Sequence, residues 1–340
     1  MPNNLIKNQK IINQTKQIMK KFLLSASVLF FMFSCQNDDA TTDAQSETAA
    51  NTSKKERGCA SHEVLDRQLK ENPGLATRMA EIERFTENAT TLGRLVNGQI
   101  EIPVVVNVLY RTTAENISLA QIQSQIDVLN QDFNATNSDY NQVPALFSGV
   151  KANVGITFVL DAVYRKSTTK SSWGTRDAMK KTKQGGLDPT SPTTKLNIWA
   201  CTIGGGILGY AQFPGGSSAT DGVVCDSKYV GVTSNSSSSY PYNLGRTATH
   251  EVGHWMNLRH IWGDATCGSD LVSDTPVHNT ANYGAPTYPH YSTCSGAPVE
   301  MTMNYMDYTD DRGMYMFSLG QKSRIDAIFA VGGVRASFRL

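Results

Sequence analysis

Hydrophobic residues recur at two different spacings along this chain of 340 residues. Residues 58–92 are highly charged, and their apolar residues recur at near-helical spacing on either side of Pro73-Gly74, which predicts two short helices. From residue 100 onward, short runs of β-branched and aromatic residues dominate instead, and these predict strands. The apolar positions that support the two helices are Val64, Leu65 and Leu69 before the break and Leu75, Met79 and Ile82 after it.

The part of the chain after residue 100 predicts an α+β domain. IEIPVVVNVLY (100–110) is β-branched and almost continuously apolar, as expected for a buried strand. Ser118 precedes LAQIQSQIDVLNQDFN, whose apolar residues follow helical spacing, so we expect a capped helix there. Further strands are expected at 155–164, 195–201, 207–214 and 222–226, and further helices at 247–257 and 318–330. The stretch between the last two helices has few apolar runs and predicts an irregular C-terminal part.

The first 57 residues have the pattern of a secretion signal followed by a tether. A short basic region at Met19 precedes an apolar run that is shorter than the roughly 20 residues of a membrane span. We expect a signal peptide at residues 1–35, with Met19 as the natural start; a membrane anchor helix is the alternative. Cys35 and the polar stretch after it resemble a bacterial lipoprotein signal. Cys35 is therefore the expected lipidation site, residues 36–57 are a disordered tether, and the protein is exported to the outer-membrane surface or the medium.

Composition narrows the range of partners. The net charge is +1 and the pI is about 7.6, which gives no electrostatic indication of nucleic-acid binding. Contact with a membrane is expected only through the lipid anchor. The sequence gives no indication of the oligomeric state.

Three of the six histidines lie in HEVGHWMNLRH (250–260). On a helix, His250 and His254 project from one face about a turn apart, so both can bind one metal ion. Glu251 lies one position round the helix, where it can bind a water instead of the ion. His260 reaches the same ion only if the chain turns sharply, and Asn257 suits the left-handed conformation of such a turn. Three imidazoles and an open fourth position predict a catalytic zinc site; incidental histidines on an amphipathic helix are the alternative.

The same stretch resembles the HExxHxxGxxH motif of the metzincin proteases, with Asn257 at the usual glycine. MNYMDYTDD (303–311) resembles their methionine turn, which implies that Met306 lies beneath the zinc and that Tyr308 lies near the metal and supports the reaction. Six stretches, spread over most of residues 58–340, are similar to the pappalysin family, which includes ulilysin-like bacterial proteases. They are IPVVVNVLY, GGGILGYAQFPG, DGVVCD, HEVGHWMNLRHIWGD, SDTPVHN and NYMDYTDD.

This resemblance implies the architecture of residues 95–340. The expected fold is an α+β metzincin-like catalytic domain with a mixed, mostly parallel sheet, an active-site helix and an irregular C-terminal subdomain. ILGYAQFP (207–214) would be an edge strand that pairs with an extended substrate.

The resemblance also gives a role to Cys59. Pappalysin pro-segments carry an Arg-Cys-Gly-like switch whose thiolate takes the fourth zinc position, and Cys59 lies in ERGCAS, with Gly58 before the cysteine instead of after it. We therefore expect residues 58–94 to form an inhibitory pro-segment that is cut near Arg94. A structural disulfide is the alternative for Cys59.

The four remaining cysteines permit three pairings. The resemblance implies the bridge Cys267–Cys294, which would leave Cys201–Cys225 to join two predicted strands. Both suit an oxidising compartment.

The stretch 267–282 is rich in oxygen ligands. Asp270, Asp274 and nearby carbonyls predict a structural calcium site, and family members bind calcium in this neighbourhood. A polar loop with solvated carboxylates is the alternative.

Together these residues predict a secreted or surface-anchored zinc endopeptidase made as a zymogen. Glu251 would act as general base on a zinc-activated water that attacks a polypeptide, and Tyr308 would help to hold the oxyanion. By resemblance, residues 307–311 line the pocket for the residue after the scissile bond, where Asp311 is the expected acid and favours Arg or Lys. The alternatives are a zinc amidase acting on cell-wall peptides and a surface lipoprotein that binds a partner through a protease fold.

Overall fold

The computed structural model describes residues 57–91, 100–233 and 241–339. The expected signal peptide, the expected lipid site Cys35 and the expected cleavage site at Arg94 lie outside these ranges, so these expectations stay predictions. No helix within the described ranges has both the length and the apolar character needed to cross a membrane.

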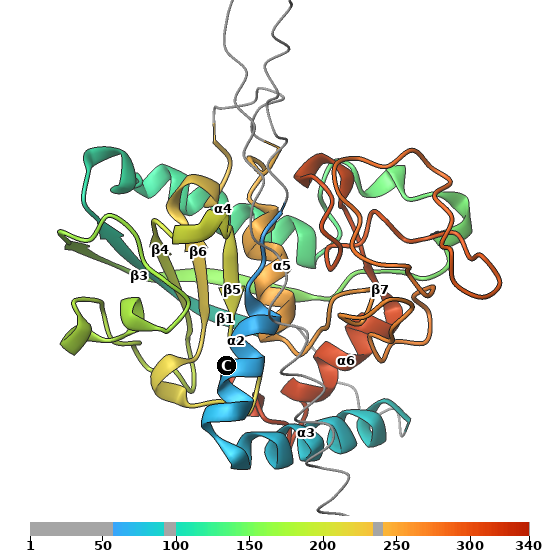
Figure 1. Cartoon of the computed structure of the whole chain (residues 1–340), viewed down its shortest axis with the longest axis horizontal. Helices are drawn as coiled ribbons and strands as arrows, with labels where there is room; N and C mark the ends of the chain where they lie inside the picture. Colours follow the sequence, from blue (N-terminus) through green and yellow to red (C-terminus); the bar gives the residue numbers. More distant parts are fainter. Residues whose placement is uncertain (1–56, 92–99, 234–240, 340) are drawn as a thin grey trace, which may run out of the picture. The chain divides into compact units, whose positions relative to one another are not determined.

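The central sheet contains β1 (Ile100–Tyr110), β3 (Ile156–Ser167), β4 (Leu196–Cys201), β5 (Gly209–Ala211) and β6 (Val223–Asp226). Their order in the sheet is β3-β1-β4-β6-β5. Only β5 runs antiparallel to its neighbour, and it forms one edge of the sheet (Figure 1). The sheet is therefore mixed and mostly parallel, as the resemblance implied, although the strand expected at 207–214 is shorter than its apolar run.

The position of β1 in the sheet explains why its sequence is almost continuously apolar. It lies between two parallel neighbours, β3 and β4, and both of its faces are covered. Its even-numbered residues, from Ile100 to Val108, belong to the larger core with the helices, whereas Leu109 belongs to a second core on the other face. A strand exposed on one face would alternate between apolar and polar residues instead.

Three helices cover the larger core. They are α4 (Leu119–Phe133), α5 (Arg246–Trp255) and α6 (Leu319–Phe329). The hydroxyl of Ser118 accepts a hydrogen bond from the Gln121 amide and so caps α4, as predicted. Between α5 and α6 the chain is largely irregular, apart from β7 (Phe317–Ser318), which pairs with β2 (Lys151–Ala152). A disulfide between Cys267 and Cys294 closes this irregular part.

The expected bridge Cys201–Cys225 is wrong, because both cysteines are free and buried. In the register of β4 and β6, Cys225 lies opposite Ala200 and not opposite Cys201. Neighbouring residues of a strand point to opposite faces, so this offset of one residue places the two thiols in different cores. Local sequence does not fix the register between two strands, so the cysteine spacing could not reveal this offset.

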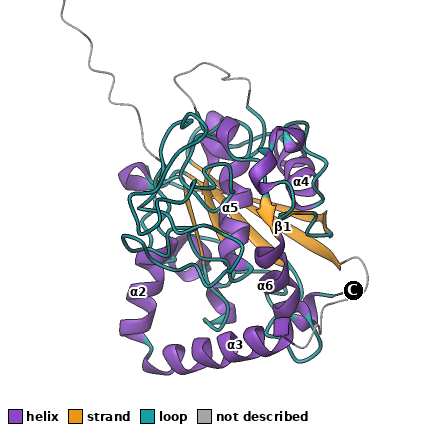
Figure 2. Ribbon diagram, turned by 90° about the vertical axis from the view of Figure 1, so that its right-hand side faces the viewer, coloured by secondary structure: helices purple, strands orange, loops and turns teal. Residues whose placement is uncertain are grey.

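Residues 57–91, called the N-terminal segment below, contain α2 (Ser61–Glu71) and α3 (Pro73–Thr91). The break between the helices falls at Asn72, one residue before the Pro73-Gly74 pair at which the sequence predicted it. Helix α2 packs against β5. Helix α3 packs against α6, and the two helices lie side by side in Figures 1 and 2. The segment thus runs from the sheet edge, past the end of the histidine helix, to the C-terminal helix.

Candidate active site

The three histidines converge on one point. His250 and His254 lie on α5, and both rings are completely buried. Asn257, beyond the end of the helix, has a positive φ of 72°, and this turn brings His260 back toward the helix as expected. Nε2 of His254 lies 3.1 Å from Nε2 of His250 and 3.0 Å from Nε2 of His260.

A partner on the second nitrogen orients each ring. His250 and His254 each donate from Nδ1 to a main-chain carbonyl, at 2.7 Å and 2.8 Å, and His260 Nδ1 lies 2.5 Å from a carboxylate oxygen of Asp264. These contacts fix the tautomer, so that the Nε2 lone pairs face the common point. Burial and the neighbouring histidines lower the pKa of His250 well below its usual range, and burial and His260 lower the pKa of His254 to about 3. Both rings are therefore neutral, as metal ligands must be.

These donors fit a zinc ion. Two Zn–N bonds of about 2.0–2.1 Å at the tetrahedral angle place the nitrogens roughly 3.3 Å apart, close to the separations found here. The Sγ atom of Cys59 joins the three nitrogens, and all four ligand atoms lie within 4.8 Å of one another. Among the described residues this is the one cluster of three or more His, Cys, Asp or Glu side chains arranged to bind a metal. Three imidazoles and one thiolate form a tetrahedral zinc donor set.

Met306 packs against the histidine helix at Gly253. Its side chain is fully buried, and a Cβ atom on Gly253 would overlap the Met306 sulfur. Gly253 lies between the two helical ligands in HEVGH, so this close approach explains a glycine that sequence reasoning did not single out. The Met306 carbonyl also accepts the Ile261 amide at 3.1 Å, which ties the methionine turn to the chain just after His260.

The N-terminal segment enters the site as an added strand. Cys59 forms a parallel bridge with Gly209 of β5. The Gly58 carbonyl accepts the Leu208 amide at 2.7 Å, and the Ala60 amide donates to the Gly209 carbonyl at 3.1 Å. The edge strand thus offers its main chain to an extended peptide. Burial, then the charge of Glu251, raises the pKa of Cys59, so ionising this thiol requires a nearby cation such as a zinc ion at the histidines.

Glu251 lies next to the metal ligands and is almost fully buried. Its Oε2 accepts hydrogen bonds from the Ser61 hydroxyl at 2.8 Å and from the Cys59 thiol at 3.4 Å. Burial raises the pKa of Glu251 to about 7, which suits a group that takes and returns protons near neutral pH. The Ser61 oxygen also accepts the Ala211 amide at 2.8 Å. Ser61 therefore connects the edge strand to Glu251, and only its nearness to Cys59 could have indicated this from sequence.

Tyr308 lies over the same cluster. Its ring centroid is 4.9 Å from that of His260 and 5.7 Å from that of His250. The Tyr308 hydroxyl donates to the Cys59 carbonyl at 3.2 Å. Burial raises the pKa of Tyr308 well above its usual range, so the hydroxyl keeps its proton and remains a donor.

Asp311 is buried and binds a side chain that the sequence analysis overlooked. The Arg57 guanidinium lies 2.5 Å from Asp311 Oδ1, and its Nε donates to the Thr309 carbonyl at 3.2 Å. The guanidinium also lies over the Tyr242 ring, 4.8 Å from its centroid. The second Asp311 oxygen accepts main-chain amides at the start of α5, the nearer at 2.8 Å. Arg57 belongs to residues 36–57, which were expected to form a disordered tether, and its burial and ion pair show that this expectation is wrong at residue 57. Its place in ERGCAS, two residues before Cys59, was the available signal.

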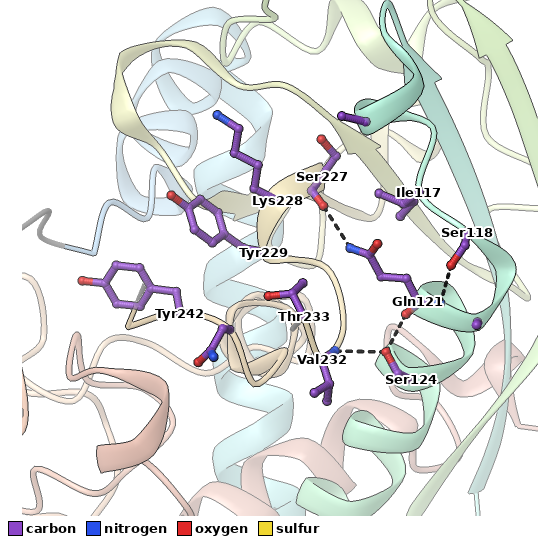
Figure 3. A pocket seen from close by; sticks show the side chains of 13 residues that line it. Ile117, Ser118, Gln121, Ser124, Ser227, Lys228, Tyr229, Val232, Thr233 and Tyr242 are labelled. Atoms are coloured by element: carbon purple, nitrogen blue, oxygen red, sulfur yellow. Dashed lines mark hydrogen bonds between the residues drawn. The ribbon is translucent and has the colours of Figure 1, made fainter. Parts of the chain in front are cut away.

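A cavity of about 620 Å³ adjoins this arginine site. Figure 3 shows Tyr229 and Tyr242 on one side of the cavity and Ser118, Gln121 and Ser124 of the α4 region on the other. Tyr242 contributes to both places, since its ring also lies under the Arg57 guanidinium.

The two acids of the expected calcium site have protein partners. Asp270 accepts hydrogen bonds from the Val272 amide and the Thr275 hydroxyl. Asp274 accepts from the Ser318 hydroxyl at 2.7 Å and the Gly320 amide at 2.8 Å. Calcium binding by these residues stays a prediction.

The family model described as pregnancy-associated plasma protein-A, a peptidase family, matches residues 200–330. An extracellular metalloprotease of Pyricularia oryzae is 32% identical over 237 residues, which is 68% of this chain and 75% of that protein. The chain belongs to the pappalysin family.

Solved pappalysin structures agree with the fold described above. Mature mirolysin of Tannerella forsythia in complex with a cleaved peptide is 40% identical, with a TM-score of 0.69 over 72% of this chain and 97% of that chain. A promirolysin mutant from the same organism is 37% identical, with a TM-score of 0.75 over 83% of this chain and 97% of that chain. This pappalysin is a metalloendopeptidase with a metzincin fold, and the zymogen form of a relative matches more of it than the mature form does.

Proposed function

We propose that this chain is the latent precursor of an exported zinc endopeptidase that cleaves polypeptides beside basic residues. The observation that carries the proposal is the meeting of the Cys59 thiol with three histidine nitrogens at one point. A thiolate there would fill the coordination position that a catalytic zinc keeps for water. In this proposal the N-terminal segment is the described part of an inhibitory pro-segment that extends to about residue 94. The relatives named as extracellular proteases support an extracellular site of action.

The latent contacts indicate what Glu251 does once the segment has left. When bound, zinc lowers the pKa of water toward about 7 and polarises a carbonyl group. Glu251, released from Ser61 and Cys59, takes the proton of the attacking water and returns it to the leaving amine. The Cys59 carbonyl stands in for a substrate carbonyl in the latent chain. By that analogy, the Tyr308 hydroxyl donates to the carbonyl oxygen during the attack.

Arg57 stands in for a substrate side chain. Its guanidinium is enclosed by a carboxylate, a carbonyl and an aromatic ring, and this set suits Arg better than Lys because it uses the planar fork and its face. By resemblance, the Asp311 pocket takes the residue after the scissile bond. We therefore propose a preference for Arg, then Lys, at that position.

The test is cleavage of a peptide library by the self-processed enzyme, read by mass spectrometry. We expect cuts before Arg and Lys, and none after zinc chelation. Glu251→Ala, first processed by added parent enzyme that is then removed, should also give none. Asp311→Asn should lose the basic preference while it keeps an acceptor for the α5 amides. Cleavage of cell-wall peptides with no cleavage of the library would instead favour the amidase. Binding without any hydrolysis would favour the lipoprotein that only captures a partner.

A further inference from the structure

Helix α3 of the N-terminal segment contacts the loop between His254 and His260, called the zinc loop below, through one carboxylate, that of Glu83. The Arg324 Nη2 atom, from α6, lies 2.9 Å from both Glu83 oxygens. The Asn257 side-chain amide donates to Glu83 Oε1 at 3.2 Å. Arg324 Nη2 also donates to the Asn257 carbonyl at 3.3 Å, which closes a ring of three residues. This cluster uses no atom of the metal site and does not involve Cys59.

Arg324 and Asn257 are both buried, and the positive charge of Arg324 requires a nearby anion. Arg324 is 7% exposed and Asn257 is 3% exposed. Among the described residues, Glu83 is the one carboxylate within ion-pair distance of Arg324, and the buried Nε of Arg324 has no hydrogen-bond partner. A buried guanidinium without a counter-ion is unfavourable, so the site favours a carboxylate over a neutral group.

Cavities lie on both sides of Glu83, so its contact with Arg324 and Asn257 contributes more to holding α3 in place here. A cavity of about 450 Å³ lies on one side, lined by Glu83, Arg324 and Leu271 among others. A second cavity of about 380 Å³ is lined by Glu83, Asn257 and Met79 among others. Glu83 thus joins α3 to the rest of the protein between these two cavities.

Asn257 is also the residue that departs from the metzincin motif, in which a glycine makes this turn. Its φ of 72° is easier for glycine than for asparagine. Glycine would make the turn but would leave Glu83 without the amide donor. The hydrogen bond from the Asn257 side chain to Glu83 therefore offsets part of the strain of the left-handed backbone.

We propose that Arg324 and Asn257 form a carboxylate-binding site, and that Glu83 occupies it as a second latch that holds the N-terminal segment on the zinc loop independently of Cys59. Calling the segment inhibitory rests on the proposed function, but the contact itself does not. Because Asn257 lies between His254 and His260, release of Glu83 loosens the loop that carries the third ligand as well as α3.

Amide hydrogen exchange of the full chain in a Glu251→Ala background, where self-cleavage is suppressed, tests the latch. Glu83→Gln removes the charge at constant shape and should speed exchange across α3 (Pro73–Thr91) and across residues 257–263 by about tenfold or more. Asn257→Gly, which suits the turn, should give a smaller increase of the same kind. Glu81→Gln, an exposed acid on the same helix, is the matched control and should change nothing.

Two further comparisons complete the test. In the double variant Glu83→Gln/Asn257→Gly, the Glu83→Gln change should increase the exchange rate by less than it does alone, because the Glu83 and Asn257 side chains share one contact. In a Cys59→Ala background the Glu83 effect should persist in full. The proposal is overturned if Glu83→Gln and Asn257→Gly both stay within twofold of Glu81→Gln, or if the Glu83 effect vanishes without Cys59. Neither result depends on whether the protein is a protease, so failure of the latch and failure of the proposed function are separable.

Discussion

Replacing Arg57 with alanine should release the latent enzyme even though Cys59 is intact. Arg57 is 3% exposed, and its partner Asp311 is completely buried. The change removes an ion pair at 2.5 Å, a hydrogen bond to the Thr309 carbonyl and the contact with the Tyr242 ring. Breaking a buried ion pair costs about 3–5 kcal/mol, and a hydrogen bond to a charged group contributes about 1.5–3 kcal/mol.

The expected loss is smaller than the sum of these contributions. Asp311 keeps two main-chain donors, the amides of Leu244 and Arg246, so its charge is not left without partners. We estimate a loss of roughly 2–4 kcal/mol in the binding of the N-terminal segment. Since about 1.4 kcal/mol corresponds to a factor of ten, the open population rises by about 30-fold to 1,000-fold.

The assay is hydrolysis of a fluorogenic Arg-containing peptide by freshly purified full-length protein, followed together with its conversion to the shorter form. Arg57→Ala should convert much faster than the parent, and Arg57→Lys should be intermediate because it keeps the charge but loses the planar contacts. Arg78→Ala is the control, since Arg78 lies in the same segment and its bond to the Gly215 carbonyl is exposed. If Arg57→Ala stays as latent as Arg78→Ala while Cys59→Ala becomes active, the Asp311 pocket does not contribute to latency.

Three further changes test Glu251, Gly253 and Asp132. Asp132 is a buried acid of α4 that accepts hydrogen bonds from the hydroxyls of Thr249 and Tyr305. Glu251→Ala should keep bound zinc, measured by metal analysis, and lose about 10²–10⁴-fold in peptide hydrolysis; activity within tenfold of the parent would remove its role as base. Gly253→Ala should lower the free energy of unfolding by about 1–3 kcal/mol in chemical denaturation, because the new methyl group meets the Met306 sulfur; unchanged stability would contradict the close packing. Burial raises the pKa of Asp132 to about 6 from 3.8, so the folded state holds the proton more tightly than the unfolded state. The unfolding free energy should therefore fall as pH rises from about 4 to 6, by up to about 3 kcal/mol from this group. Asp132→Asn should show a shallower fall in urea titrations over that range, and an identical slope would be evidence against the raised pKa.

Local patterns were sufficient to predict much of this protein. The continuous apolar run of β1, the Ser118 cap and the break at Pro73 each depend on neighbouring residues alone. The histidine cluster is also partly a local feature, because helix geometry places His250 and His254 on one face.

The position of His260 beside them needed one more local fact, the left-handed turn at Asn257. The methionine turn, by contrast, was recognised through resemblance and not through spacing. Packing later supplied its physical reason, the close approach of Met306 to Gly253.

Contacts between distant parts of the chain were decided only by the tertiary structure. Cys201 and Cys225 lie in neighbouring strands, yet a register offset of one residue puts their thiols on opposite faces of the sheet. Arg57 and Asp311 are 254 positions apart, and Glu83 and Arg324 are 241 apart. Helical and strand periods are set by backbone geometry over a few residues, so sequence determines them. Register and long-range pairing depend on how whole elements pack, and that information appears only once the chain has folded.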